Sequence, residues 1–292
     1  MTLKEILQHA SQEHWSTGHF NASEFDQVRA IAEACKEVGA PAIIGTSEGE
    51  RKHMGLIEAL AVRDAFRKDF GIPIFLNADH CKSVESAKET VEAGYDSVHI
   101  DLSKLSLEDN IGGTKEIVAS AREKDKDISV EGEVGYFVTE ASKVYKEVFE
   151  IPPESLTKPE EAERFVKETG VDRLAIAVGN IHGISLNEPH LDIARIKAIR
   201  ERISKEVTLV LHAGSGIPED QIRAAIEAGI ANIHISTELR LAFVNALKES
   251  LATELDEVAM YKLDQSAIVA MKELVKEKLR LFGSEDKLKG RR

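Results

Sequence analysis

The feature that most constrains the fold of this chain is an eightfold alternation between short apolar runs and segments with helical periodicity. The apolar runs cover residues 16–21, 40–47, 72–79, 96–102, 128–134, 173–178, 208–214 and 232–237. Several of them are rich in Val, Ile and Leu, as expected for parallel strands whose sheet is covered by helices on both faces. Eight strand–helix units within 292 residues predict an α/β protein with a closed (β/α)8 TIM barrel rather than an open doubly wound sheet.

No linker-like or low-complexity segment divides the chain, so we expect one domain over residues 1–292. The longest break in the alternation is residues 135–157, after the fifth strand, where a barrel would carry an active-site loop. From residue 238 onward the helical pattern continues for longer than barrel closure requires. We therefore expect extra C-terminal helices that cap the barrel or pack against a partner subunit.

Composition and charge argue against several classes of function. The formal net charge of −13 disfavours a nucleic-acid partner, because an acidic surface repels a phosphate backbone. No apolar run reaches the roughly 18–20 residues that cross a bilayer, and the first residues lack the apolar core of a signal peptide. Two cysteines, Cys35 and Cys81, are too few for a disulfide framework. We expect a cytoplasmic protein without nucleic-acid or membrane partners.

Three of the ten histidines lie near the carboxyl ends of predicted strands. His80 follows the third strand, His182 follows the sixth, and His212 lies in the last part of the seventh. Because the carboxyl ends of barrel strands converge on one rim, these side chains should be neighbours although they are far apart in the sequence. Three neutral imidazoles with an open fourth position would form a catalytic zinc site, and the alternative is a coincidence of three rim histidines.

Carboxylates lie close to the same rim. Asp79 precedes His80 and would point the opposite way along an extended strand, unless the chain turns there. Asp101 ends the fourth strand, and Glu131 and Glu133 alternate along the fifth, so both glutamates face one side. Carboxylates inside a barrel are costly to bury unless they are paired or near a metal. Asp101 and Glu133 are therefore candidates either for occasional metal ligands or for salt bridges.

Two turns offer chemistry suited to an anion. Gly214 and Ser215 lie in a turn before a helix, where backbone N–H groups and the helix dipole attract phosphate. After the eighth strand, Ser236 and Thr237 offer hydroxyls and Arg240 lies one turn into the next helix. The turns after strands seven and eight are the usual phosphate site of such barrels, so we expect an anionic substrate here.

These stretches together resemble the class II, metal-dependent fructose-bisphosphate and tagatose-bisphosphate aldolase family. The resemblance spans the chain, and its most specific elements are Asp-His in "NADHCKS", Gly-Asn-x-His-Gly in "VGNIHG" and His-x-Gly-Ser-Gly in "LHAGSG". It implies a TIM barrel, usually in a homodimer or homotetramer. It also implies reversible cleavage of fructose 1,6-bisphosphate or tagatose 1,6-bisphosphate to dihydroxyacetone phosphate and glyceraldehyde 3-phosphate. The implied cofactor is zinc or another divalent metal acting as a Lewis acid, and a monovalent-cation requirement stays open.

The resemblance also assigns roles to residues of this chain. Asp79 matches the acid that protonates the aldehyde oxygen. The residues that match zinc ligands, followed by the carboxylates near an alternative metal position, are His80, His182, His212, Asp101 and Glu133. The matching substrate and phosphate contacts, together with the hydroxyls of the turn after strand eight, are Ser47, Gly183, Gly214, Ser215, Arg240, Ser236 and Thr237.

Departures from the family pattern lie on the substrate side. Leu186 stands where a phosphate-contacting lysine is expected, and His234 stands where the family has an asparagine. His234 is a catalytic candidate, because its ring could replace the asparagine's hydrogen bond to the enediolate. Glu140 falls near the position of a catalytic loop carboxylate, in a loop that lacks the usual Gly-Gly-x-Glu-Asp. These departures leave the predicted metal ligands intact and bear on the identity of the substrate.

Two alternatives to a bisphosphate aldolase stay open. The first keeps the metal and the aldol chemistry but acts on another ketose phosphate or a 2-oxo sugar acid, which Leu186 and His234 favour. The second is a metal-binding relative without catalysis, which would require the loop base to be missing. A zinc hydrolase of the barrel type is disfavoured, because the first strand carries no His-x-His pair.

Overall fold

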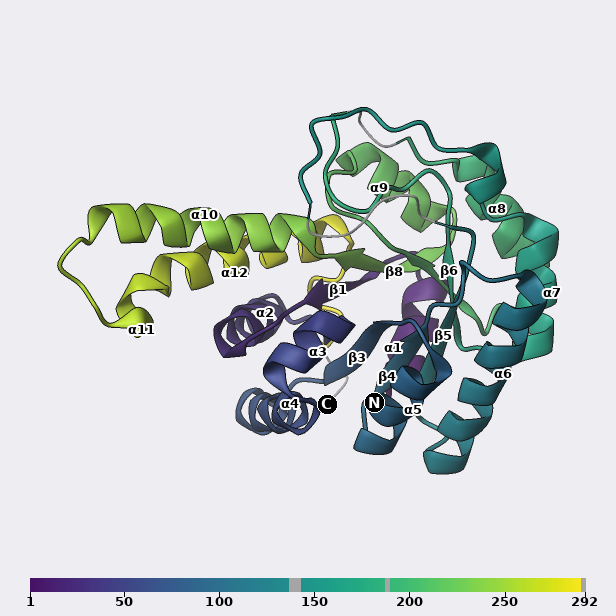
Figure 1. Ribbon diagram of the computed structural model, residues 1–292, viewed down its shortest axis with the longest axis horizontal. Helices are drawn as coiled ribbons and strands as arrows, with labels where there is room; N and C mark the ends of the chain where they lie inside the picture. Colours follow the sequence, from purple (N-terminus) through teal and green to yellow (C-terminus); the bar gives the residue numbers. More distant parts are fainter. Residues whose placement is uncertain (137–142, 187–189, 290–292) are drawn as a thin grey trace.

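The computed structural model describes residues 1–136, 143–186 and 190–289. Eight parallel strands form a closed barrel in sequence order, with β8 hydrogen-bonded to β1 (Figure 1). The strands are β1 (Thr17–Asn21), β2 (Ala42–Thr46), β3 (Ile74–Cys81), β4 (Ser97–Ile100), β5 (Ser129–Val134), β6 (Arg173–Ile176), β7 (Thr208–Leu211) and β8 (Ile230–Ile235). The predicted TIM barrel is confirmed.

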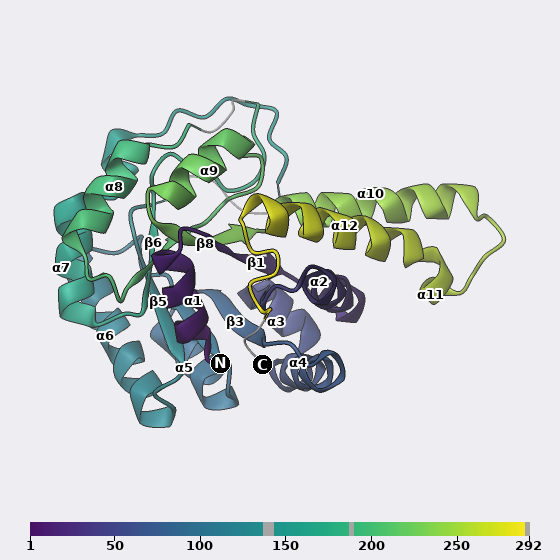
Figure 2. The same cartoon turned by 180° about the vertical axis from the view of Figure 1, so that it is seen from behind.

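Helices surround the barrel and connect consecutive strands (Figures 1 and 2). Those outside the strands are α2 (Phe25–Val38), α4 (Leu56–Phe70), α5 (Val84–Ala93), α6 (Leu107–Lys124), α7 (Pro159–Thr169), α8 (Ile193–Arg202) and α9 (Glu219–Glu227). Shorter elements in the connections are α3 (Glu48–Met54) and the 3-10 helix η1 (Pro153–Ser155). The predicted extra C-terminal helices are present as α10 (Thr237–Thr253), α11 (Met260–Leu263) and α12 (Gln265–Leu281).

Local sequence signals explain where several helices begin and end. The first helix, α1 (Leu3–Gln12), begins at a capping box in which the Thr2 hydroxyl accepts from the Glu5 N–H and the Glu5 carboxylate accepts from the Thr2 N–H. Gly39 ends α2 and Gly170 ends α7, and both adopt the left-handed conformation with φ of 69°. These capping residues fix where α1 begins and where α2 and α7 end.

The main core lies between the outer face of the barrel and the helices. Outward-facing strand side chains such as Ile44, Val98, Val130 and Leu209 are fully buried in this layer. Burial of one such side chain contributes about 1.5–3 kcal/mol. Because the strands together contribute many of these side chains, the outer layer supplies most of the apolar burial that stabilises the barrel.

The amino ends of the strands are closed by α1, which is drawn near the N terminus in Figure 2. Its apolar face and Trp15 form a second buried cluster with Ile43, Phe75 and Ala231, which lie at the starts of β2, β3 and β8. This plug leaves the carboxyl ends of the strands as the open end of the barrel.

The C-terminal helices form an arm. Helices α10 and α12 pack side by side and project away from the barrel beyond α2, joined at the far end by α11 (Figure 1). Exposed apolar side chains at and near that end are Leu251, Leu255, Val258, Met260 and Tyr261. Among the described residues, no helix has both the length and the apolar character that crossing a bilayer requires.

Candidate active site

The carboxyl end of β3 turns sharply at His80, whose φ is 46° although it is not a glycine. The pairing of β3 with β4 also shifts register between Ala78 and Cys81. This turn answers the question left by the sequence, because Asp79 and His80 both line one cavity instead of pointing to opposite faces. A left-handed non-glycine residue costs about 1–3 kcal/mol, so the surrounding structure must hold it in place.

Arg51 of α3 provides part of that support. Its guanidinium donates to the carbonyl oxygens of Thr46 and Asp79, the latter at 3.1 Å, and lies 3.4 Å from the Cys81 sulfur. Arg51 is buried, and the sequence analysis did not single it out. The arginine thus connects the ends of β2 and β3 directly behind the site.

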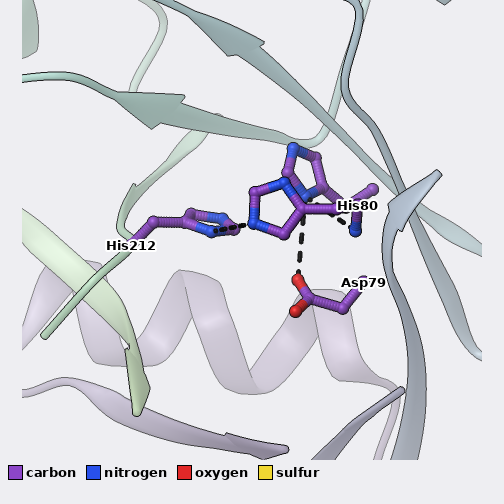
Figure 3. A group of neighbouring side chains, drawn as sticks. Asp79, His80 and His212 are labelled. Atoms are coloured by element: carbon purple, nitrogen blue, oxygen red, sulfur yellow. Dashed lines mark hydrogen bonds and ion pairs between the residues drawn. The ribbon is translucent and has the colours of Figure 1, made fainter. Parts of the chain in front are cut away.

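The three histidines predicted to meet are neighbours at the open end of the barrel. His80 Nε2 lies 3.1 Å from His212 Nδ1, and Figure 3 shows these two rings together with Asp79. The His182 ring centroid lies 5.3 Å from that of His80 and 6.2 Å from that of His212. The three strand ends do bring these imidazoles near one another, but His182 is in none of the groups of described residues whose ligand atoms lie within 4.8 Å, so the three-histidine ligand set stays a prediction.

The predicted carboxylates surround His80. Asp101 Oδ2 lies 2.9 Å from His80 Nδ1, and the Ser103 hydroxyl donates to the other Asp101 oxygen at 2.6 Å. Glu133 Oε2 lies 3.9 Å from His80 Nδ1 and 3.3 Å from Nε2 of His99. Both readings of these carboxylates, as salt-bridge partners and as metal ligands, remain compatible with such distances.

Beneath the histidines, the barrel interior is polar. Glu131 accepts from His212 Nε2 at 2.6 Å with one oxygen and pairs with Arg173 at 2.7 Å through the other. Arg173 is fully buried and also donates to Asn232, Asn77 and Ser97. Both terminal nitrogens of the guanidinium are hydrogen-bonded, while Nε has no partner, and this network links His212 through Glu131 to the barrel interior.

Two further histidines, His19 and His99, belong to the same cluster and were missed by the sequence analysis. His19 stacks on His234 with ring centroids 3.6 Å apart, and His234 lies 3.9 Å from His212. His99 lies 4.5 Å from His80 between centroids. A signal was available, because His99 precedes Asp101 by two positions on one strand and therefore shares its inward face.

Burial sets the protonation states in this cluster. Burial and the charge of His80 lower the pKa of His182 to about 3, and burial with the charge of His99 lowers that of His212 well below its usual value. Burial would raise the pKa of Asp79, but the charge of His80 and the nearby rings of His234 and His99 outweigh it, so the pKa lies well below its ordinary range. The neutral His182 and His212 rings beside the ionised Asp79 suit cation binding, whereas neighbouring carboxylates raise the pKa of His80 and of His99 against the effect of burial, so a cation bound there would displace their protons.

The residues present fit a divalent metal. In the described part of the chain, four groups of side chains have possible ligand atoms within 4.8 Å of one another. They are Asp79, His80, His99 and His212; His19, Asp79 and His234; Glu131, His212 and His234; and His80, Asp101 and Glu133. Oδ1 of Asp79, Oε2 of Glu133 and Nδ1 of His234 are buried without a hydrogen-bond partner, as expected where a cation completes the site.

A cavity of about 290 Å³ opens beside this cluster. The predicted substrate and catalytic residues that line it are Ser47, Asp79, Gly183, Ser215, His234, Ser236, Thr237 and Arg240. Gly214 is not in the wall, because its N–H donates to the His234 carbonyl at 2.9 Å. Glu140 lies outside the described residues, and Leu186 is exposed and not in the wall.

The substrate side of the cavity contains a carboxylate that the sequence analysis missed. Glu50 of α3 is buried and forms an ion pair with Arg240. Asn21 of β1 donates to Glu50 at 3.0 Å and also to Asp79 at 3.0 Å. The Glu50–Arg240 pair is therefore connected through one amide to the side chain predicted to transfer a proton.

Comparison with known proteins agrees with this geometry. Residues 1–287 match the family model described as fructose-bisphosphate aldolase class-II. The crystal structure of the YdjI aldolase from Escherichia coli K12 is 30% identical and superposes with a TM-score of 0.83, covering 99% of each chain. Fructose-bisphosphate aldolase from Campylobacter jejuni shares the fold, with 20% identity, a TM-score of 0.78 and coverage of 98% of this chain and 95% of that one. The match over nearly the whole sequence and a buried imidazole–carboxylate cluster consistent with a metal site lead to one conclusion: the chain belongs to the class II fructose-bisphosphate aldolase family, whose members are metal-dependent aldehyde-lyases.

Proposed function

We propose that this chain is a zinc-dependent aldolase that reversibly cleaves a ketose phosphate to dihydroxyacetone phosphate and an aldehyde. The observation that carries the proposal is the meeting of His80, His182 and His212 beside a cavity that Asp79 also lines. These three imidazoles would hold the ion, with Asp101 and Glu133 available for an alternative position. When bound, a divalent ion supplies a Lewis acid that polarises the ketose carbonyl and stabilises the negative charge left by carbon–carbon cleavage.

The residues of the cavity wall would handle the proton. Asp79 is ionised at neutral pH because its pKa lies well below the usual range, so it would accept the proton of the C4 hydroxyl as the bond breaks. In the condensation direction the same carboxyl group returns that proton to the aldehyde oxygen. In the cleavage direction the enediolate carbon must also gain a proton to give dihydroxyacetone phosphate, and the resemblance assigns this role to Glu140, which lies outside the described residues. Asn21 and His234 hold Asp79 in place, at 3.0 Å and 3.5 Å respectively. His234 faces the substrate and stays neutral, because burial lowers its pKa.

One phosphate would bind at the turns after β6, β7 and β8. Gly183, Ser215, Ser236 and Thr237 line this part of the cavity. The Ser215 hydroxyl accepts from two N–H groups at the start of α10, those of Ser236 and Glu238, at 3.4 and 3.3 Å. The hydroxyls of Ser215, Ser236 and Thr237 at the N-terminus of α10 would favour a phosphate there, in line with the helix dipole.

The two substrates predicted from the sequence, fructose 1,6-bisphosphate and tagatose 1,6-bisphosphate, are the first to test. Cleavage of fructose 1,6-bisphosphate would yield glyceraldehyde 3-phosphate and give the chain a role in glycolysis. A ketose phosphate or sugar acid with a different far end is the second candidate. It is favoured because Leu186 supplies no charge and Arg240 is already paired with Glu50.

The decisive experiment measures two half-reactions of the purified chain, each with and without a chelator. Release of triose phosphate from both bisphosphates reports complete cleavage. Exchange of a dihydroxyacetone phosphate hydrogen for deuterium, followed by NMR, reports the chemistry that does not depend on the aldehyde. Metal-dependent exchange supports the proposal whichever sugar is cleaved. If neither exchange nor cleavage occurs in the metal-loaded protein, the proposed reaction is wrong.

We also propose that the chain forms a homodimer or homotetramer through the arm of α10, α11 and α12. The support is the set of exposed apolar side chains near the arm's end, including Leu255 and Val258, which are 82% and 89% exposed. Contiguous exposed apolar surface commonly marks a protein–protein contact. Analytical ultracentrifugation of the wild type and of a Leu255→Asp, Val258→Asp variant tests this, and a wild-type monomer would contradict it.

A further inference from the structure

The carboxylate of Glu50 is fixed on the substrate side of the cavity. Its Oε1 contacts the Arg240 guanidinium, and its Oε2 accepts from Asn21 Nδ2 at 3.0 Å and from the Ser47 N–H at 2.6 Å. Only 6% of its surface is exposed, compared with 30% of the Arg240 side chain. Both oxygens are thus engaged from three different elements, β1, α3 and α10.

A purely structural role explains only half of these contacts. Glu50 follows Ser47 by three positions, and the bond from its Oε2 to the Ser47 N–H is half of a capping box at the start of α3. That motif does not require the ion pair of Oε1 with Arg240, which comes from the other side of the cavity mouth. It also leaves unexplained why the same carboxylate is joined through Asn21 to Asp79.

The charge at the Arg240 end of the cavity does not suit a second phosphate. Among the described residues, the Asp, Glu, Lys and Arg side chains of the wall are Asp79, Lys82 and Arg240, and the buried Glu50, which is not itself in the wall, offsets the charge of Arg240. A phosphate group brings a charge of about −1.5 to −2 at neutral pH. The hydroxyls of Ser215, Ser236 and Thr237 suit one such group, whereas a second group near Arg240 would also meet the negative charge of Glu50.

We infer that Glu50 determines specificity, and that the substrate carries a single phosphate and presents an uncharged, hydroxyl-bearing end to the Glu50–Arg240 pair. This inference rests on the proposed aldolase function and narrows its substrate class. A sugar hydroxyl carries no charge, so it can accept from Arg240, which lines the cavity, without meeting repulsion from the buried Glu50 behind it. A second phosphate would bring negative charge close to the negative charge of Glu50.

The test compares two ligands that differ by one phosphate, fructose 1-phosphate and fructose 1,6-bisphosphate. Each is titrated into the metal-loaded full chain while deuterium exchange of dihydroxyacetone phosphate is followed, and the concentration that halves the exchange rate is recorded. In the wild type, the concentration of fructose 1-phosphate that halves the exchange rate should be at least about fivefold lower than that of fructose 1,6-bisphosphate. In Glu50→Gln, which keeps the cap but loses the charge, this preference should shrink by at least about fivefold.

The matched control is Glu58→Gln, which removes the same charge from an exposed position on the neighbouring helix α4 and should leave the preference unchanged. Glu50→Ala removes the cap as well and should shift the preference in the same direction as Glu50→Gln. A wild type that binds the bisphosphate as tightly as the monophosphate would overturn the inference, and so would a preference that Glu50→Gln leaves intact. Absence of exchange in every variant would instead overturn the proposed function and this inference with it.

Discussion

The β3–β7 side of the barrel mouth and the β8–β1–β2 side are built in different ways. On the first side, imidazoles and carboxylates come from strand ends and contact one another directly, as His80 does with Asp101 and His212 with Glu131. On the second side, the charged groups Glu50 and Arg240 come from helices and meet across the opening. The strand-end groups are positioned by the barrel itself, whereas the rim groups belong to helices that connect the strands. The first side is therefore suited to constant chemistry and the second to variable substrates.

The strongest test of the strand-end side is His212→Ala. We expect this variant to lose bound metal and to lose aldol cleavage by at least about 10³-fold, because the ring bridges His80 and Glu131. Zinc content measured by atomic absorption, with circular dichroism as a check of folding, provides the readout. His53→Ala, at an exposed position on α3, should behave as the wild type. Unchanged zinc content in His212→Ala would show that its role as a ligand is misassigned.

The next largest effect concerns the buried network of Arg173 and Glu131 in the barrel interior, below the histidine cluster. Arg173→Met leaves Glu131 as a buried charge without its partner, so we expect the free energy of unfolding to fall by about 3–5 kcal/mol. Denaturant unfolding measures this change. Arg29→Met removes an arginine from the half-exposed ion pair with Glu33 and should cost less than about 1 kcal/mol. Equal losses in the two variants would mean that the interior network contributes no more than a surface pair.

The two sides also differ in how well the sequence predicted them. Counting strand–helix units was enough to predict the barrel, because the periodicity repeats eight times and errors of a few residues at strand ends do not change the count. The eighth strand, for example, runs from Ile230 to Ile235 rather than over 232–237. His80, His182 and His212 could be grouped because barrel topology alone brings their strand ends together.

What the sequence could not predict depends on contacts between distant elements. The left-handed turn at His80 has no local signature, since glycine is the residue that usually adopts it. His19 and His99 could have been found from strand alternation, because each shares the inward face of its strand with a polar residue two positions later. Glu50 could not, because nothing in the sequence near α3 indicates that Arg240 of α10 will lie beside it.

The pH dependence of folding stability tests whether the fold keeps the buried His19 ring neutral. Burial lowers the pKa of His19 to about 4 in the folded chain, against about 6.5 when unfolded. The unfolded chain therefore binds a proton between these values that the folded chain does not, so folding stability falls as pH drops from 6.5 to 4. The loss is about 3 kcal/mol for this residue.

The readout is the free energy of unfolding of the chelator-treated protein, measured by denaturant at several pH values. His19→Asn removes the titrating group, so its stability should fall less steeply over this interval than that of the wild type. His80 and His99 change in the opposite direction, since neighbouring carboxylates raise their pKa values against the effect of burial, and the comparison of slopes separates them from His19. Parallel curves for the two proteins would show that His19 is not held neutral by the fold.

The smallest expected effect is a change in bisphosphate affinity caused by one added charge on the substrate side. Leu186 is 69% exposed where the family pattern predicts a phosphate-contacting lysine, so Leu186→Lys supplies the positive charge that the pattern expects at this position. We expect the concentration of fructose 1,6-bisphosphate that halves deuterium exchange to fall about three- to tenfold, and less at high salt, because an exposed charge is screened within about 8 Å at physiological ionic strength. Leu255→Lys adds the same charge on the distant arm and should have no effect. If Leu186→Lys and Leu255→Lys behave alike, then the charge of the rim does not govern bisphosphate binding, and the preference must come from the Glu50–Arg240 pair alone.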